Sequence, residues 1–253
     1  MKSKAADRSP FCCVREDRAI FSRYSAFAVH VFTAIGSVLG FLALVEASAH
    51  RWQMAFAWLG VALVVDGVDG PIARHIGVTK KLPRFSGDQL DLIIDYLTYV
   101  VVPAYIIYEA GIVPAGLELA AAAIVLLTSL FHFIDQESKT KDGFFVGFPA
   151  IWNIVALYLL IFPFDKWLAF AVLAVLGSLT FVPLKWIHPI RVRRLRPLTL
   201  LVMIAWAAAA VAALRGELPS SLTVQAVIAV STIYFIAVGL LRSWGGDDPS
   251  ATD

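Results

Sequence analysis

The stretch WQMAFAWLGVALVVDGVDGPIARH, residues 52–75, changes character along its length. Its first half is almost entirely apolar, as expected of a helix that crosses a lipid bilayer and needs about 20 such residues. Its second half contains Asp66, Asp69 and Arg74, and charged side chains are costly inside a membrane and usually mark functional positions there. Either this segment lies outside a membrane, or its polar end binds something.

Composition favours the membrane. The chain has 253 residues, of which 59% are hydrophobic and 16% charged, and a mean hydropathy of +0.77. An average soluble domain has roughly 25% charged residues, so this is predicted to be an all-α integral membrane protein. The net charge of +2 is too small to indicate a nucleic-acid partner.

Apolar runs long enough to span the bilayer predict about eight transmembrane helices. They are expected at approximately 25–48, 52–72, 90–111, 115–134, 145–163, 167–186, 197–214 and 222–241. Residues 1–24 are predicted to form a cytoplasmic segment, residues 25–242 a single polytopic catalytic domain, and residues 243–253 a flexible tail. The adjacent Cys12 and Cys13 are interpreted as reduced cytoplasmic thiols, with lipidation and metal capture as open alternatives.

The basic residues set the orientation. With the N-terminus in the cytoplasm and eight alternating spans, all of the 21 Lys and Arg except Arg51, Lys166 and Arg215 face the cytoplasm. This distribution obeys the positive-inside rule. The sequence therefore predicts a multi-pass protein of the bacterial inner membrane, with both termini and residues 66–74 on the cytoplasmic side.

Four aspartates follow a helical spacing at this edge. Asp66 and Asp69 lie one turn apart at the end of the second predicted helix. Gly87, Asp91 and Asp95 are spaced at i, i+4 and i+8 at the start of the third helix, so the two stripes can face each other across a short loop. Converging carboxylates repel one another unless a cation neutralises them, and oxygen ligands suit Mg²⁺, Mn²⁺ or Ca²⁺. Four of them can hold two ions for phosphoryl chemistry.

Small residues and one arginine complete the pattern. Gly67, Gly70, Ala73 and Gly87 leave helix surfaces bare, which permits either close helix packing or close approach of a ligand. The planar donor group of Arg74 suits a phosphate. Pro71 is expected to bend the helix. Packing glycines with aspartates near the membrane edge remain the alternative interpretation.

The pattern D-G-x-D-G-x-x-A-R … G-x-x-x-D-x-x-x-D resembles the signature of the CDP-alcohol phosphotransferases. It covers Asp66 to Arg74, then Gly87, Asp91 and Asp95. The resemblance implies a helical membrane enzyme that transfers a phosphatidyl or similar group from a CDP-linked donor to an alcohol and releases CMP. It implies that the four aspartates hold divalent metal, with Asp91 and Asp95 catalytic and Asp95 placed to act as the base. It also implies that the CMP part of the donor is lined by Gly70, Ala73, Arg74 and Gly87.

Two departures from the common pattern narrow the resemblance. Twelve residues, HIGVTKKLPRFS, separate Arg74 from Gly87, where most members have about eight or nine, and eight spans exceed the usual six. Both features resemble the bacterial phosphatidylcholine synthases, which condense CDP-diacylglycerol with choline. The stretches KDGFFVGFPAIWN (141–153) and FVPLKWIHPIRVRRLRPL (181–198) also look like that branch. The implied activity is that of a CDP-diacylglycerol–choline O-phosphatidyltransferase with Mn²⁺ or Mg²⁺ as cofactor.

Alternatives remain open for the acceptor and for the class of protein. Serine, inositol or glycerol phosphate could replace choline, and the aspartates could instead be the ion site of a divalent-metal transporter. Aromatic faces bind quaternary ammonium groups; such a cage could come from Tyr96, Tyr99, Trp152, Tyr158 or Trp186, although such residues are also typical of membrane interfaces. Basic residues of the cytoplasmic loops, such as Lys80, Lys81 and Arg84, could attract anionic lipid or could only set the topology. The sequence leaves open whether the chain forms a homodimer.

Overall fold

The computed structural model describes residues 10–135, 145–182, 185–186 and 196–244, and these are almost entirely helical. Two-residue strands β1 (Phe145–Val146) and β2 (Lys185–Trp186) form an antiparallel pair. The helices are α1 (Pro10–Ser48), α2 (Trp52–Ile76), α3 (Val78–Lys81), α4 (Gly87–Asp95), the π-helical η1 (Tyr96–Val101), α5 (Val102–Glu109), α6 (Glu118–Ile134), α7 (Trp152–Ile161), α8 (Lys166–Leu179), α9 (Arg196–Arg215) and α10 (Leu222–Trp244).

Four helical segments are long and apolar enough to cross a bilayer by length and composition. They are Ser22–Ser48, Trp52–Ile76, Gly87–Glu109 and Pro197–Arg215. Four shorter apolar segments are Glu118–Ile134, Trp152–Ile161, Lys166–Leu179 and Leu222–Val238. Every predicted apolar run thus contains a helix. Of these eight helical segments, four are long enough in the described residues to cross a bilayer.

Two predicted spans extend beyond the helices that the structure shows. The span predicted at 145–163 is helical only from Trp152, because Gly147 and Ala150 adopt positive φ angles of 80° and 53° and Pro149 disfavours helix in the residue before it. The buried Phe148 packs against the fully buried Trp152, so an apolar loop contributes to the core. The span predicted at 167–186 ends at Leu179, and residues 185–186 pair with β1 instead.

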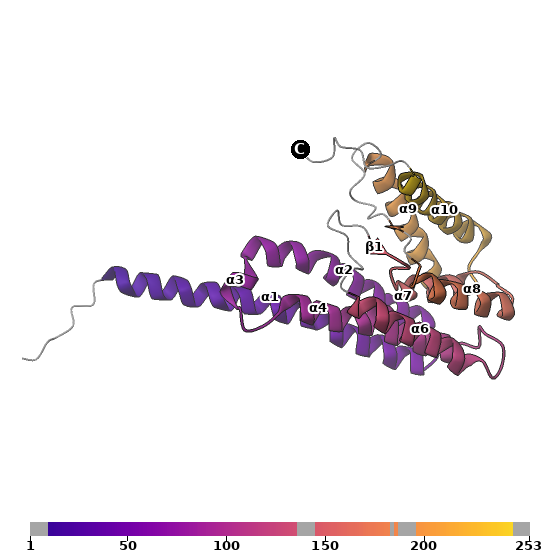
Figure 1. Cartoon of the computed structure of the whole chain (residues 1–253), viewed down its shortest axis with the longest axis horizontal. Coiled ribbons are helices and arrows are strands. Elements are labelled where there is room, and N and C mark those ends of the chain that lie inside the picture. The colour runs from indigo at the N-terminus through magenta and orange to yellow at the C-terminus, as the bar shows by residue number, and fades with distance from the viewer. Residues whose placement is uncertain (1–9, 136–144, 183–184, 187–195, 245–253) are drawn as a thin grey trace, which may run out of the picture.

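The first predicted span also differs in its extent, since α1 begins at Pro10 rather than near residue 25. Figure 1 shows α1 extending past the other helices at its N-terminal end. The C-terminal tail predicted at 243–253 falls, from residue 245 onward, outside the described residues.

Helix α1 is the neighbour that α2 and α4 share, since both pack along it. Its glycines make this contact close. A Cβ on Gly36 would lie 2.6 Å from Ile94 Cγ2, and one on Gly40 would lie 2.9 Å from Leu97 Cδ2. The order of these contacts means that α1 runs parallel to the α4–η1–α5 helix. Since α2 returns antiparallel to α1, the C-terminal part of α2 and the start of α4 lie at the same end of the bundle.

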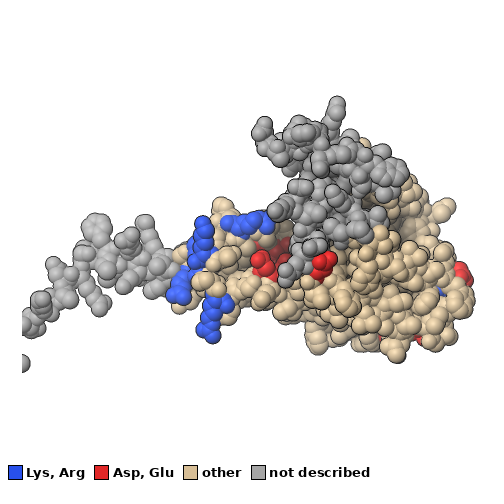
Figure 2. Space-filling view, viewed as in Figure 1, with Lys and Arg blue, Asp and Glu red and all other residues tan. Residues whose placement is uncertain are grey.

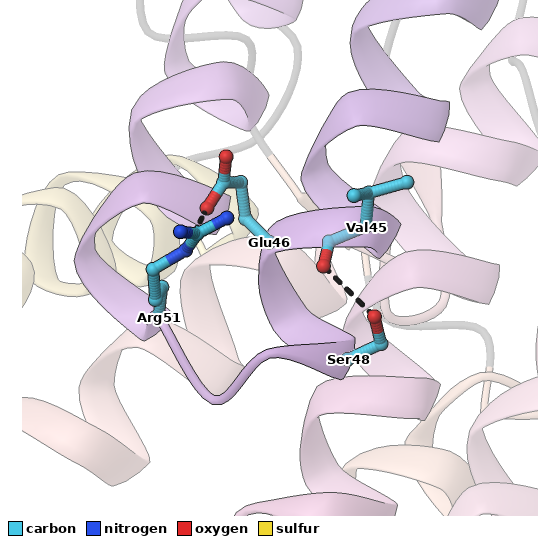
Figure 3. Close-up of polar contacts among 4 residues, drawn as sticks. All are labelled: Val45, Glu46, Ser48 and Arg51. Atoms are coloured by element: carbon cyan, nitrogen blue, oxygen red, sulfur yellow. Dashed lines mark hydrogen bonds and ion pairs between the residues drawn. The ribbon is translucent and has the colours of Figure 1, made fainter.

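Helices α1 and α2 form a hairpin, and the two helices are joined at its other end by a tight turn (Figure 3). The Arg51 guanidinium pairs with the Glu46 carboxylate at 2.5 Å, and the Ser48 hydroxyl donates to the Val45 carbonyl at 2.8 Å. The Arg51 N–H donates to the Glu46 carbonyl at 3.0 Å. The turn therefore pairs its two charged side chains and forms several of its own backbone hydrogen bonds.

The main core lies where α5, α6, α7 and α8 meet, and α9 and α10 pack together beside it (Figure 1). Trp152, Ile106, Ile161 and Leu173 are fully buried there. The core also contains polar links, since Trp152 Nε1 donates to the Ser129 hydroxyl at 2.7 Å. These contacts hold α5, α6, α7 and α8 together. The carboxylates of Asp66, Asp91 and Asp95 lie outside this core, on α2 and α4.

Candidate active site

Three of the four predicted aspartates meet in space. Each of Asp66, Asp91 and Asp95 offers a carboxylate oxygen, and these atoms all lie within 4.8 Å of one another. Asp66 comes from α2, whereas Asp91 and Asp95 lie one turn apart on α4. Each of the three residues is half-buried. A hard divalent cation fits this set, because it prefers oxygen ligands and neutralises their mutual repulsion.

The fourth aspartate, Asp69, does not belong to this trio. It lies on α2 one turn beyond Asp66 and is buried, with 6% of its surface exposed. A carboxylate at that depth needs a compensating partner. The sequence spacing predicts all four aspartates on two facing stripes. The structure instead brings three of them together and leaves Asp69 apart from them and more buried.

Gly70 and Arg74 act together on α2. A Cβ on Gly70 would lie 3.3 Å from Arg74 Nη1, so the guanidinium folds back along the helix over the bare glycine. Ala73, one turn beyond Gly70, packs with a small cluster around Ala26 and Val29 of α1. Helix α2 is uninterrupted through Pro71, which is exposed, and Gly77, where φ is 72°, caps its C-terminal end. A Cβ on Gly67 would meet nothing within 4 Å, so packing between helices does not require that glycine here.

The twelve residues between Arg74 and Gly87 have a defined structure. Gly77 caps α2 and allows the chain to start the short helix α3 immediately. Val78 of α3 is buried against α1, and Leu82 packs on the same cluster. Ser86 then caps α4 by accepting from the Gln89 N–H at 3.2 Å. The extra length therefore forms an anchored segment at the edge of the site.

Gly87 faces α1. A Cβ on it would lie 3.3 Å from Cε1 of His30, a residue that the sequence reasoning did not single out. His30 is buried, and among the described residues nothing hydrogen-bonds to its Nε2. A single histidine within an apolar run gave no signal, since its position beside Gly87 depends on how α1 packs against α4.

Basic side chains lie close to this end. Arg23, Arg74, Lys80 and Arg84 are exposed, and Lys81 is half-buried. Figure 2 shows basic side chains gathered at the narrow end of the described surface, with acidic side chains next to them. Further basic residues of the predicted cytoplasmic loops, Arg191, Arg193 and Arg194, lie outside the described residues, as does the side chain of Arg196.

The aromatic residues considered for a choline cage mostly have structural partners. Trp152 is fully buried. The Tyr158 hydroxyl lies 2.8 Å from that of Thr232 and accepts from Trp206 Nε1 at 2.6 Å. The Tyr96 hydroxyl donates to the Leu126 carbonyl at 3.2 Å. Tyr99 is different, because its hydroxyl donates to Asp66 Oδ2 at 2.9 Å. The side chain of Trp186 lies outside the described residues.

Comparison with known proteins agrees with this geometry. The family model for CDP-alcohol phosphatidyltransferases matches residues 25–187, which include every aspartate of the site. A phosphatidylcholine synthase of Mesorhizobium japonicum is 46% identical over 216 residues, covering 85% of this chain and 81% of the relative. One of Agrobacterium fabrum is 42% identical over 222 residues, covering 88% and 92%. One of Pseudomonas aeruginosa is 43% identical over 185 residues, covering 73% and 78%. The chain belongs to the CDP-alcohol phosphatidyltransferase family.

Proposed function

We propose that this protein is a membrane enzyme that transfers the phosphatidyl group of CDP-diacylglycerol to choline and releases CMP. The observation that carries the proposal is the convergence of Asp66, Asp91 and Asp95 from two helices, beside the glycine and arginine of the same motif. The relatives named phosphatidylcholine synthase support choline as the acceptor.

The carboxylates hold the metal in this proposal. Asp66, Asp91 and Asp95 already place oxygen atoms within reach of one cation. The more buried Asp69 would complete a site for two Mn²⁺ or Mg²⁺ ions. When bound, such ions neutralise the pyrophosphate and make the phosphorus more electrophilic. The donor set contains no thiolate or imidazole, which agrees with a hard ion.

The donor nucleotide lies along α2 and the start of α4. Gly70, Ala73 and Gly87 give the CMP part room next to the backbone, and Arg74 donates to its phosphate. The packing of the Arg74 guanidinium over Gly70 supports this role, since the glycine lets the side chain lie against the helix. A site at the membrane edge can meet both the acyl chains and the water-soluble nucleotide.

In the transfer step, Asp91 acts as a metal ligand and Asp95 acts as the base. Asp95 accepts the proton of the choline hydroxyl, because an alcohol is a poor nucleophile until that proton leaves. The choline oxygen forms a bond to the phosphorus of the phosphatidyl group. The bond from that phosphorus to the oxygen that bridges to CMP breaks, and CMP departs with this oxygen.

The membrane topology is part of the proposal. Residues 25–242 form one catalytic domain of eight spans in the bacterial inner membrane, with both termini and the site on the cytoplasmic side. The pairing of β1 with β2 supports this arrangement, because the two strands belong to loops that the positive-inside rule assigns to the same side.

One assay tests the function directly. Purified full-length protein is supplied with CDP-diacylglycerol and choline, with and without Mn²⁺ or Mg²⁺, and CMP formation is measured. CMP should form only when both choline and metal are present. Consumption of serine, inositol or glycerol phosphate in place of choline would contradict the acceptor. Metal flux into liposomes without CMP release would instead indicate a transporter.

A further inference from the structure

A tyrosine contacts the carboxylate cluster from outside the sequence motif. The Tyr99 hydroxyl of η1 donates to Asp66 Oδ2 of α2 at 2.9 Å. Tyr99 is half-buried, and a phenol hydroxyl in such a position usually needs a hydrogen-bond partner. This bond joins the helix that carries Asp91 and Asp95 to the helix that carries Asp66.

The helix geometry explains how Tyr99 reaches α2. Asp91, Asp95 and Tyr99 are spaced at i, i+4 and i+8, and the chain changes from α-helix to π-helix immediately after Asp95. A π-helical turn is wider than an α-helical turn and often occurs at functional sites. The widened turn keeps Tyr99 on the same face as the two aspartates, one turn deeper in the bundle.

Tyr96, from the same π-helical segment, has a different role. Its hydroxyl donates to the Leu126 carbonyl of α6 at 3.2 Å, and its ring packs edge-on against Phe133 with 5.6 Å between centroids. Both tyrosines therefore use one hydroxyl bond to tie η1 to a neighbour. Only the bond of Tyr99 ends on a member of the carboxylate trio.

We propose that Tyr99 is a positioning residue that orients the Asp66 carboxylate for metal binding. This inference rests on the proposed function. By donating to Oδ2, the phenol restricts the rotation of the Asp66 carboxylate relative to Asp91 and Asp95. Hydrogen bonds of this kind orient metal ligands, and their loss typically weakens metal affinity about 10- to 100-fold. Tyr99 therefore acts on the metal through Asp66, and it does not supply an aromatic face to choline.

The test compares Tyr99→Phe with Tyr96→Phe in the full-length purified protein. Each variant removes one hydroxyl from η1 and keeps the ring. Mn²⁺ binding is measured without substrates, by electron paramagnetic resonance of free Mn²⁺, together with the thermal midpoint. Tyr99→Phe should raise the Kd for Mn²⁺ about tenfold or more, whereas Tyr96→Phe should leave it unchanged. Tyr99→Met, which also lacks the donor, provides the measurement if Tyr99→Phe does not fold.

Turnover gives a second readout. The Mn²⁺ concentration for half-maximal CMP release should rise in Tyr99→Phe, with kcat recovered at saturating Mn²⁺ and the KM for choline unchanged. An unchanged Kd for Mn²⁺, or a raised KM for choline with normal Mn²⁺ binding, would overturn the inference. If instead the wild-type protein shows no choline-dependent CMP release, the proposed function fails, and that result is distinct from failure of the Tyr99 variant alone.

Discussion

Charged residues lie at both ends of α2, but the neighbouring charges are opposite at one end and alike at the other. At the turn that precedes α2, Glu46 and Arg51 have opposite charges and pair with each other. At the other end, Asp66 lies beside Asp91 and Asp95, which have the same charge. A pair of opposite charges is complete in itself, whereas a group of like charges is stable only with a proton, a donor or a cation. The first end is a structural turn, and the second has the properties of a binding site.

The largest expected effect comes from neutralising the like-charged end. Asp91→Asn or Asp95→Asn should leave a folded protein and lower CMP release by about 100-fold or more, because a metal ligand or the base is lost. Asp88→Asn is the matched control, since Asp88 is an exposed acid in the first turn of the same helix. Wild-type turnover in Asp91→Asn or Asp95→Asn would refute the assignment of metal and base.

A smaller effect is expected from filling the space over Gly70. Gly70→Leu would occupy the place where the Arg74 guanidinium lies, and loss of a hydrogen bond to a charged phosphate costs roughly 1.5–3 kcal/mol. The apparent KM for CDP-diacylglycerol should therefore rise about tenfold or more. Gly60→Leu makes the same change on α2 where a Cβ meets nothing within 4 Å. If both variants behave alike in this assay, Gly70 has no special role.

The smallest effect is expected at the turn. Glu46→Gln removes the ion pair with Arg51, in which the Arg51 side chain is 60% exposed and that of Glu46 is 19% exposed. Solvent around the arginine screens such a pair and holds its contribution to about 1 kcal/mol. The free energy of unfolding should fall by no more than this amount, with turnover unchanged. Chemical denaturation and the CMP assay measure the two quantities. A marked loss of turnover would show that the two ends of α2 are coupled.

Much of the fold follows from hydrophobicity. Each apolar run contains a helix, because a backbone in lipid must satisfy its own hydrogen bonds. The boundaries at Trp152 and Leu179 did not follow, since an apolar run looks the same whether it is a helix or a loop packed into the core. The glycines that bring helices together, Gly36 and Gly40, have no distinct sequence signal, whereas Gly67 and Gly70 stand beside charged residues in a recognisable motif.

The sequence by itself determined that carboxylates spaced one turn apart lie at the start of one helix and the end of another. The chemistry of those side chains made a divalent cation the expected ligand. Only the tertiary structure decided that Asp66, Asp91 and Asp95 converge while Asp69 lies deeper, and that the Tyr99 hydroxyl reaches Asp66. Spacing along one helix fixes which residues share a face. The distance between two helices depends on their rotation and register, which here are set by packing along α1.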